Sequence, residues 1–161
     1  MDQKEITILQ TKDHISEVRK ELLMVINNLA DRAQNHDASK MSDIEVDTFV
    51  EFTPKLKNST YGSEEYKGFL EQMKPALDHH YANNSHHPEF RSNGILGMSL
   101  FDLIEMICDW RAATRRHADG DIFKSIEINQ KRFGYGNELK QIFLNTVNEI
   151  IRLEEEKADG G

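Results

Sequence analysis

Apolar residues recur every three or four positions along almost the whole chain, and few residues interrupt this pattern. The 161 residues include only three prolines and nine glycines. A period near 3.6 is typical of amphipathic helices, whereas half-buried strands alternate with a period of two. We therefore predict an all-α chain, folded as a single-domain helical bundle of about five to seven helices over residues 1–161.

Interruptions of the periodic pattern divide the chain into helices and connections. Helices are expected at about 12–34, from 42 toward Pro54, 64–83, 99–116, 122–133 and 137–155. Pro75 should kink the third helix or mark its start after a break. Connections are expected at 35–40, 58–63, 86–97 and 117–121, where turn-forming residues gather. Residues 12–116 contain the candidate site, 122–155 form the C-terminal helices, and 156–161 are expected to be a disordered tail.

Three of these helices have a recognisable start. Thr11 is the expected N-cap of the first helix. Ser42 and Glu45 have the spacing of a capping box, and Ser99 with Asp102 forms another helix-start signature.

Composition limits the classes of partner. Twenty basic against 28 acidic residues give a net charge of −8, which disfavours binding to the backbone of a nucleic acid polymer. The single cysteine, Cys108, excludes an internal disulfide and fits a reducing compartment. No apolar run approaches the roughly 18 residues of a membrane span, and the N-terminus lacks the apolar region of a signal peptide. We therefore expect a cytoplasmic protein that binds neither a membrane nor a nucleic acid polymer.

Helix periodicity separates the histidines that point inward from those that do not. His14 lies four residues before Val18, and His80 lies three residues after Leu77, so both belong to apolar stripes. His79 is rotated by about 100° from His80. The candidate metal ligands are His14, His36, Asp37, His80, His86, His87 and Asp109. Mixed imidazole and carboxylate ligands suit Mn, Fe, Co, Ni or Zn.

Each of these residues also has an ordinary structural interpretation. A single inward histidine is more often a hydrogen-bonded core residue than a ligand, and a row of helix carboxylates is more often a solvated face. Asp102 and Glu105, which share a face with Asp109, are therefore either groups that orient ligand histidines or surface carboxylates. An ionised carboxylate near a core must be paired or metal-bound. The complete set of residues favours a metal site.

The order of these residues resembles the HD-domain superfamily of metal-dependent phosphohydrolases. The family pattern is a histidine on one helix, a His-Asp doublet at the next and an aspartate on a later helix. His14, the doublet His36-Asp37 and Asp109 match it in that order. The stretch HDASK resembles the HD-x-x-K form of many members, which puts Lys40 beside the metal. The resemblance covers about residues 14–110 and implies an HD-like helical fold.

The segment HHYANNSHHPEFRSNG resembles the added histidines of two-metal members of the superfamily. On that match His80, His86 and His87 are ligands of a second metal, and Asp37 bridges the two metals. The segment lacks the Gly-Tyr-Pro signature of the cyclic-dinucleotide phosphodiesterases, so that substrate is not implied. More narrowly, LDHHYANNSHHPEF, GMSLFDLIEMICDW and SIEINQKRF are similar to a small uncharacterised phage and bacterial family of HD-like proteins. A phage-encoded member would act in the host cytoplasm.

The resemblance implies phosphoester hydrolysis with one or two divalent ions, from among Mn, Fe, Co, Ni, Mg and Zn. Asp37 and Asp109 would hold the metal and orient the attacking water, while Lys40 would neutralise charge on the phosphate. Basic residues expected to contact phosphate, or else to be solvated surface charges, are Arg111, Arg115, Lys131 and Arg132. Arg132 is favoured because it lies in the matching stretch SIEINQKRF, and Arg111 is the second choice.

We therefore predict a metal-dependent phosphohydrolase that acts on a small phosphorylated substrate, with a nucleotide as the leading candidate. The main alternative is a catalytically silent regulatory or accessory protein that binds metal or nucleotide. A third interpretation is a plain helical bundle with polar core networks and no stoichiometric metal. Exposed apolar residues on the last helix would also allow a homodimer.

Overall fold

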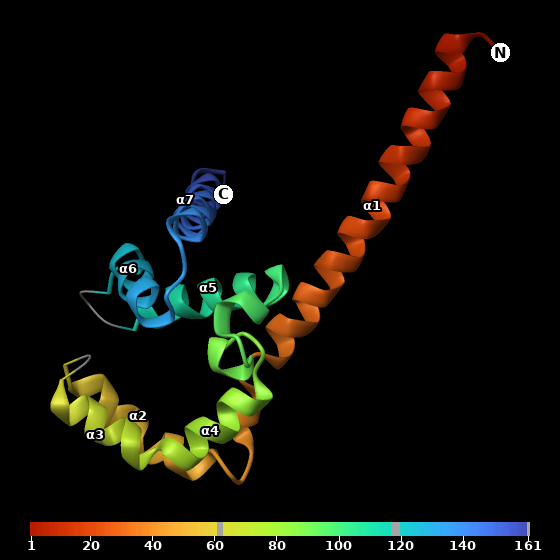
Figure 1. The fold of residues 1–161 in the computed structure, drawn as a ribbon. Coiled ribbons are helices and arrows are strands. Elements are labelled where there is room, and N and C mark those ends of the chain that lie inside the picture. The colour runs from red at the N-terminus through yellow and green to blue at the C-terminus, as the bar shows by residue number, and fades with distance from the viewer. Residues whose placement is uncertain (61–62, 117–119, 161) are drawn as a thin grey trace. The chain divides into compact units, whose positions relative to one another are not determined.

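The computed structural model describes residues 1–60, 63–116 and 120–160, and within these residues it is helical without strands (Figure 1). This confirms the predicted all-α fold class. The α-helices are α1 (Gln3–Asn35), α2 (Val46–Asn58), α3 (Glu64–Gln72), α4 (Lys74–Asn83), α5 (Leu100–Thr114), α6 (Ile122–Phe133) and α7 (Asn137–Asp159). Short 3₁₀ helices are η1 (Ala38–Met41), η2 (Pro88–Phe90) and η3 (Gly94–Gly97).

The chain divides into two compact units, Met1–His36 and Asp37–Gly161. The first unit consists almost entirely of α1, and the second contains α2 to α7. The assignment of residues 1–161 to one domain stays a prediction. Among the residues that the structure describes, no helix has both the length and the apolar composition needed to cross a membrane.

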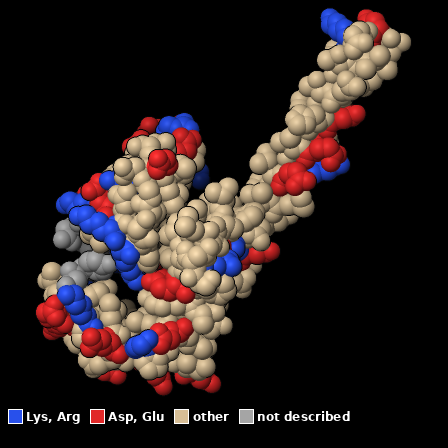
Figure 2. All heavy atoms as spheres, in the orientation of Figure 1, with Lys and Arg blue, Asp and Glu red and all other residues tan. Residues whose placement is uncertain are grey.

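α1 begins nine residues earlier than predicted. Asp2 is its N-cap and forms a capping box with Glu5, whereas Thr11 lies inside the helix and donates a hydrogen bond to the Thr7 carbonyl. No residue of α1 is buried, and much of the face of this helix that Figure 2 shows is without charged side chains. His14 is exposed in the Met1–His36 unit taken by itself, because this unit contains no second element to cover the apolar stripe; its predicted inward position stays a prediction.

The main apolar core of the second unit lies between α5, α6 and α7. Its buried members include Met106, Ile107, Ile126, Phe143 and Val147. The bounds predicted for α6 are confirmed, and α5 starts with the Ser99–Asp102 capping box as expected. In the predicted connection at 117–121, residues 117–119 lie outside the described part of the chain.

The start predicted for α2 is wrong. Ser42 precedes a turn in which its carbonyl accepts hydrogen bonds from the backbone N–H groups of Glu45 and Val46, and the helix begins only at Val46. Glu45 is the N-cap, but its side chain makes no cap hydrogen bond. The helix end predicted near Pro54 is also wrong, because Pro54 lies inside α2, which ends at Asn58. Residues 61–62 of the predicted loop at 58–63 lie outside the described part of the chain.

Two further helix boundaries follow from local chemistry. The predicted interruption near Pro75 is confirmed, because α3 and α4 are separated at Met73 and the proline lies in the first turn of α4. The tail expected to be disordered from residue 156 is helical through Asp159. Arg152 pairs with Glu149 and Glu156 along this last stretch, and such pairs support a helix rich in glutamate. Residue 161 lies outside the described residues.

Candidate metal centre

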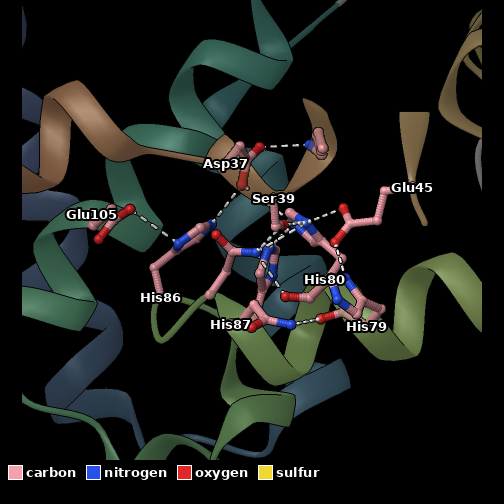
Figure 3. A network of polar contacts seen from close by, with 11 residues as sticks. Asp37, Ser39, Glu45, His79, His80, His86, His87 and Glu105 are labelled. Carbon is pink, nitrogen blue, oxygen red and sulfur yellow. Dashed lines mark hydrogen bonds and ion pairs between the residues drawn. The ribbon is translucent and has the colours of Figure 1, made fainter. Parts of the chain in front are cut away.

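Four side chains of the Asp37–Gly161 unit converge on one point (Figure 3). Asp37, His80, His86 and His87 each present a potential ligand atom within 4.8 Å of the other three. His80 and His86 are buried, and the other two are half-buried. They come from the N-cap of η1, from α4 and from the connection that follows α4. All four belong to the ligand set predicted from the sequence.

Asp37 lies at the centre of this cluster. Its φ of 55° is in the left-handed region, which disfavours most residues with a side chain but is tolerated better by aspartate. One carboxylate oxygen, Oδ1, lies 3.3 Å from His80 Nε2 and 3.4 Å from His86 Nε2, and Oδ2 accepts from Lys40 Nζ at 2.5 Å. Burial raises the pKa of Asp37, but the contacts with His80, His86 and Lys40 outweigh burial and hold the pKa far below its ordinary value.

His80 turns its Nε2 toward Asp37 because a buried carboxylate occupies its other ring nitrogen. His80 Nδ1 lies 3.0 Å from Oε2 of Glu45, which has no exposed surface. A carboxylate beside Nδ1 can accept its proton in a hydrogen bond, and Nε2, which faces Asp37 Oδ1, is then the ring nitrogen left to bind a metal ion. The predicted inward direction of His80 is confirmed by its 2% exposure.

His86 repeats this arrangement with a different carboxylate. Its Nδ1 lies 3.0 Å from Oε1 of Glu105 on α5, and its Nε2 faces Oδ1 of Asp37. A carboxylate behind a histidine is the usual device that fixes the ring of a metal ligand. The contact therefore supports the interpretation of Glu105 as a group that orients a ligand histidine.

His87 supplies a third imidazole, with its Nε2 at 3.0 Å from Nε2 of His80. Burial lowers the pKa of His87 to about 3; the neighbouring His86 and His80 lower this pKa further, while Asp109 and Asp37 raise it. The ring is therefore neutral near pH 7, which is the form that can bind a metal.

The spacing of these atoms fits a shared divalent ion. Two donors about 2.1 Å from one ion lie about 3.0 Å apart at an octahedral angle and about 3.4 Å apart at a tetrahedral angle. The observed separations are 3.0 Å between the Nε2 atoms of His80 and His87, and 3.3 and 3.4 Å from Asp37 Oδ1 to His80 and His86. Three imidazoles and one carboxylate suit a transition metal better than Mg²⁺.

Asp102 fixes the segment that carries two of these histidines. Its carboxylate is fully buried and accepts hydrogen bonds from Ser85 Oγ at 2.7 Å, Arg91 Nη2 at 2.9 Å and Ser99 N at 2.9 Å. Burial raises the pKa of Asp102, but these donors outweigh burial and leave the pKa well below its ordinary value. Because Ser85 directly precedes His86, Asp102 ties the histidine segment to α5. Its burial excludes the alternative of a surface carboxylate.

Of the other predicted site residues, one lies near Asp37 and two contact carboxylates outside the cluster. Asp109 is half-buried and presents a carboxylate oxygen within 4.8 Å of a ligand atom of Asp37. Arg111 contacts Glu154 of α7, and Arg132 contacts Glu89 at 2.8 Å, so both arginines have carboxylate partners. His14 and His36 belong to the Met1–His36 unit, and their role as ligands stays a prediction.

Glu45 is a residue of this site that the sequence pattern does not place there. The capping-box interpretation uses its spacing from Ser42, but its two oxygens contact His79 Nδ1 at 2.6 Å and His80 Nδ1 at 3.0 Å instead. The sequence does contain a pattern that indicates the inward direction of Glu45. Glu45 lies four residues before Phe49 and seven before Phe52, so helical periodicity places it on the apolar face of α2.

A family model described as Family of unknown function (DUF5662) matches residues 3–153. The chain belongs to this family. The matched span includes every residue of the cluster around Asp37. No curated protein and no solved structure matches the chain.

Proposed function

We propose that the chain is a metal-dependent phosphohydrolase of the HD type, acting on a small phosphorylated substrate such as a nucleotide. One observation carries this proposal. His80 and His86 each have a carboxylate on Nδ1 and turn Nε2 toward the same oxygen of Asp37, whose other oxygen contacts Lys40. A fixed set of metal donors beside an ammonium group is suited to binding a phosphoryl group.

The donor set would hold one or two divalent ions, from among Mn, Fe, Co, Ni, Zn and Mg. Such ions lower the pKa of a coordinated water toward about 7 and polarise a phosphoryl oxygen. His80, His86 and His87 would bind through Nε2, and Asp37 would bind through Oδ1. The sequence hypothesis adds Asp109 as a ligand, together with His14 and His36 from the Met1–His36 unit.

Two groups of the chain have roles toward the substrate in this proposal. The carboxylate of Asp109 accepts a hydrogen bond from the attacking water and orients it. Lys40 places its ammonium near the phosphoryl oxygens, where positive charge stabilises the transition state. The single cysteine and the net charge of −8 fit a small substrate in the cytoplasm, or in a host cytoplasm for a phage protein.

A second candidate is a catalytically silent protein that binds metal or nucleotide for regulation or assembly. It is favoured by the carboxylate contacts of Arg111 and Arg132, which engage the two arginines expected to hold phosphate. An enzyme requires these arginines to release Glu154 and Glu89 when substrate binds, or requires Lys40 alone to meet the phosphate charge.

Phosphate release separates the two candidates. The full chain is freed of metal, reconstituted with Mn²⁺ or Co²⁺, and incubated with a panel of nucleoside mono-, di- and triphosphates, with EDTA as the control. A phosphohydrolase releases phosphate or a nucleoside product only in the reconstituted sample, and Asp37→Ala abolishes that release. Stoichiometric metal binding without any turnover supports the silent protein instead.

A further inference from the structure

We propose that Glu45 is a positioning residue of the metal centre, which fixes the ring of His80 so that Nε2 alone faces the bound ion. This inference rests on the proposed metal centre and adds a residue to it. The carboxylate of Glu45 has no exposed surface, and its two oxygens divide between two histidines: Oε1 faces His79 Nδ1 at 2.6 Å, and Oε2 faces His80 Nδ1 at 3.0 Å (Figure 3). A buried carboxylate needs such donors.

The direction of the hydrogen bond to His80 follows from the neighbouring groups. Asn84 Nδ2 and Ser39 Oγ also lie near His80 Nδ1, at 3.1 and 3.0 Å. The amide nitrogen of Asn84 has only two hydrogens, however, and these are used by the His80 carbonyl and by Ser39 Oγ, each at 2.7 Å. Asn84 therefore has no hydrogen left for His80 Nδ1, whereas the Ser39 hydroxyl can either accept from Nδ1 or donate to it. A proton on Nδ1 is the arrangement that gives the buried Glu45 carboxylate a donor at 3.0 Å, and we assign this tautomer to His80.

The local structure of α2 supports a dedicated role for this side chain. Glu45 occupies the N-cap, where an acidic side chain ordinarily accepts a hydrogen bond from the first helical N–H groups. Neither oxygen does so here. The side chain instead points to α4, and its contacts join two residues 34 and 35 positions further along the chain. The helix start forgoes its cap so that the carboxylate reaches the histidines.

Glutamine is an informative replacement because it keeps the size of the side chain but has only one acceptor oxygen. Its NH₂ group would oppose the N–H of one of the two histidines. Glu45→Gln should therefore loosen His80 and weaken metal binding by about 10–100-fold, as for other groups that orient a metal-bound histidine. When His79 is also replaced, the single amide oxygen of the glutamine at position 45 can accept from His80 without competition. The double variant Glu45→Gln/His79→Ala should recover most of the affinity.

The experiment titrates the metal-free full chain with Zn²⁺ by calorimetry. The parent is compared with Glu45→Gln, with the double variant, and with Glu51→Gln, an exposed glutamate on the same helix that pairs with Lys55. Weaker binding in Glu45→Gln alone, with recovery in the double variant, supports the proposal. Equal affinity of Glu45→Gln and the parent overturns it.

A second measurement needs no variant and remains decisive if Glu45→Gln does not fold. Nitrogen-15 spectra of the Zn²⁺-loaded parent should show a protonated Nδ1 and a metal-bound Nε2 for His80, whereas zinc on Nδ1 overturns the proposal. A parent that binds no Zn²⁺ removes the metal centre and this inference together. A parent that binds Zn²⁺ but releases no phosphate from any nucleotide contradicts the proposed hydrolase, while the role of Glu45 stands on the affinities.

Discussion

Replacing Asp102 with asparagine should destabilise the Asp37–Gly161 unit by about 3 kcal/mol. Asparagine keeps the shape of the side chain, but its NH₂ group must replace one of the two carboxylate oxygens. Oδ1 accepts from Ser85, while Oδ2 accepts from Arg91 and from both the N–H and the hydroxyl of Ser99. With the amide nitrogen in place of Oδ2, its N–H groups oppose those of Arg91 and Ser99. With the nitrogen in place of Oδ1, the Ser85 hydroxyl must reverse to accept, and Arg91 still loses its charged partner.

The magnitude follows from the contacts that are lost. Breaking a buried ion pair by changing one partner costs about 3–5 kcal/mol, and a helix N-cap interaction contributes about 1 kcal/mol. The Arg91 side chain is 34% exposed, so its guanidinium can recover hydration once the carboxylate is gone. This compensation favours the lower end of the range, about 3 kcal/mol.

The effect of Asp102 should depend on pH with a defined sign. Its pKa is lower in the folded protein than the value of about 3.9 expected in the unfolded chain. A group of this kind contributes its full stability above the unfolded pKa and loses it as the pH falls through the folded pKa. The difference in free energy of unfolding between the parent and Asp102→Asn should be constant from about pH 5 to 7 and shrink below about pH 4.

Urea unfolding, followed by the fluorescence of Trp110, measures this difference at each pH. Trp110 packs against Phe133 and Phe143 between the C-terminal helices, so its signal reports on the core of the unit. Asp78→Asn is the matched control, because Asp78 is an exposed aspartate paired with Lys74 and should change stability by less than about 0.5 kcal/mol. Equal unfolding midpoints for the parent and Asp102→Asn would refute this account of the buried carboxylate.

Three further predictions concern the metal centre. Asp37→Ala should lose more metal than any other single change, because it removes the carboxylate that faces two histidines; elemental analysis that finds under about 0.2 equivalents in the reconstituted parent would contradict the metal centre itself. Lys40→Met should keep or slightly raise the metal content, since it removes positive charge, yet lower turnover by about 10²-fold; turnover at the parental rate would make Lys40 a structural charge. His80→Ala should lower metal occupancy, whereas His79→Ala should cost little because its Nδ1 faces Glu45 and its side chain is 30% exposed; equal occupancies in the two variants would contradict this difference.

Much of the fold follows from local signals in the sequence. Ser99 and Asp102 define the start of α5, and Pro75 marks the interruption between α3 and α4, because each acts on backbone groups within one turn. The phase of apolar residues also places His80 inward, as observed. Local chemistry is sufficient where no distant group competes for the same side chain.

Local preference is overridden where a distant group competes for the side chain. Glu45 has capping-box spacing from Ser42, but the histidines of α4 take both of its oxygens, and α2 starts one turn later than expected. At the N-terminus, a better cap at Asp2 lengthens α1 beyond the start predicted at Thr11. The cap motif at Ser42 is thus overridden by distant histidines, whereas the cap expected at Thr11 is replaced by an earlier local cap.

The carboxylates of α5 show that a row of acidic residues along a helix can be either a solvated face or a face buried against another segment. Asp102, Glu105 and Asp109 are spaced by three and four residues, so they lie on one face, and such a face is ordinarily solvated. Here each carboxylate faces a group from another segment: Asp102 faces Ser85, Glu105 faces His86, and Asp109 lies close enough to His87 to raise its pKa against the effect of burial. The covering segment supplies successive residues of its own, Ser85 to His87, to successive turns of the helix. Acidic residues on successive turns of one helix, facing hydroxyl or imidazole side chains at successive positions of another segment, therefore indicate a buried polar face. A solvated face has no such partner segment.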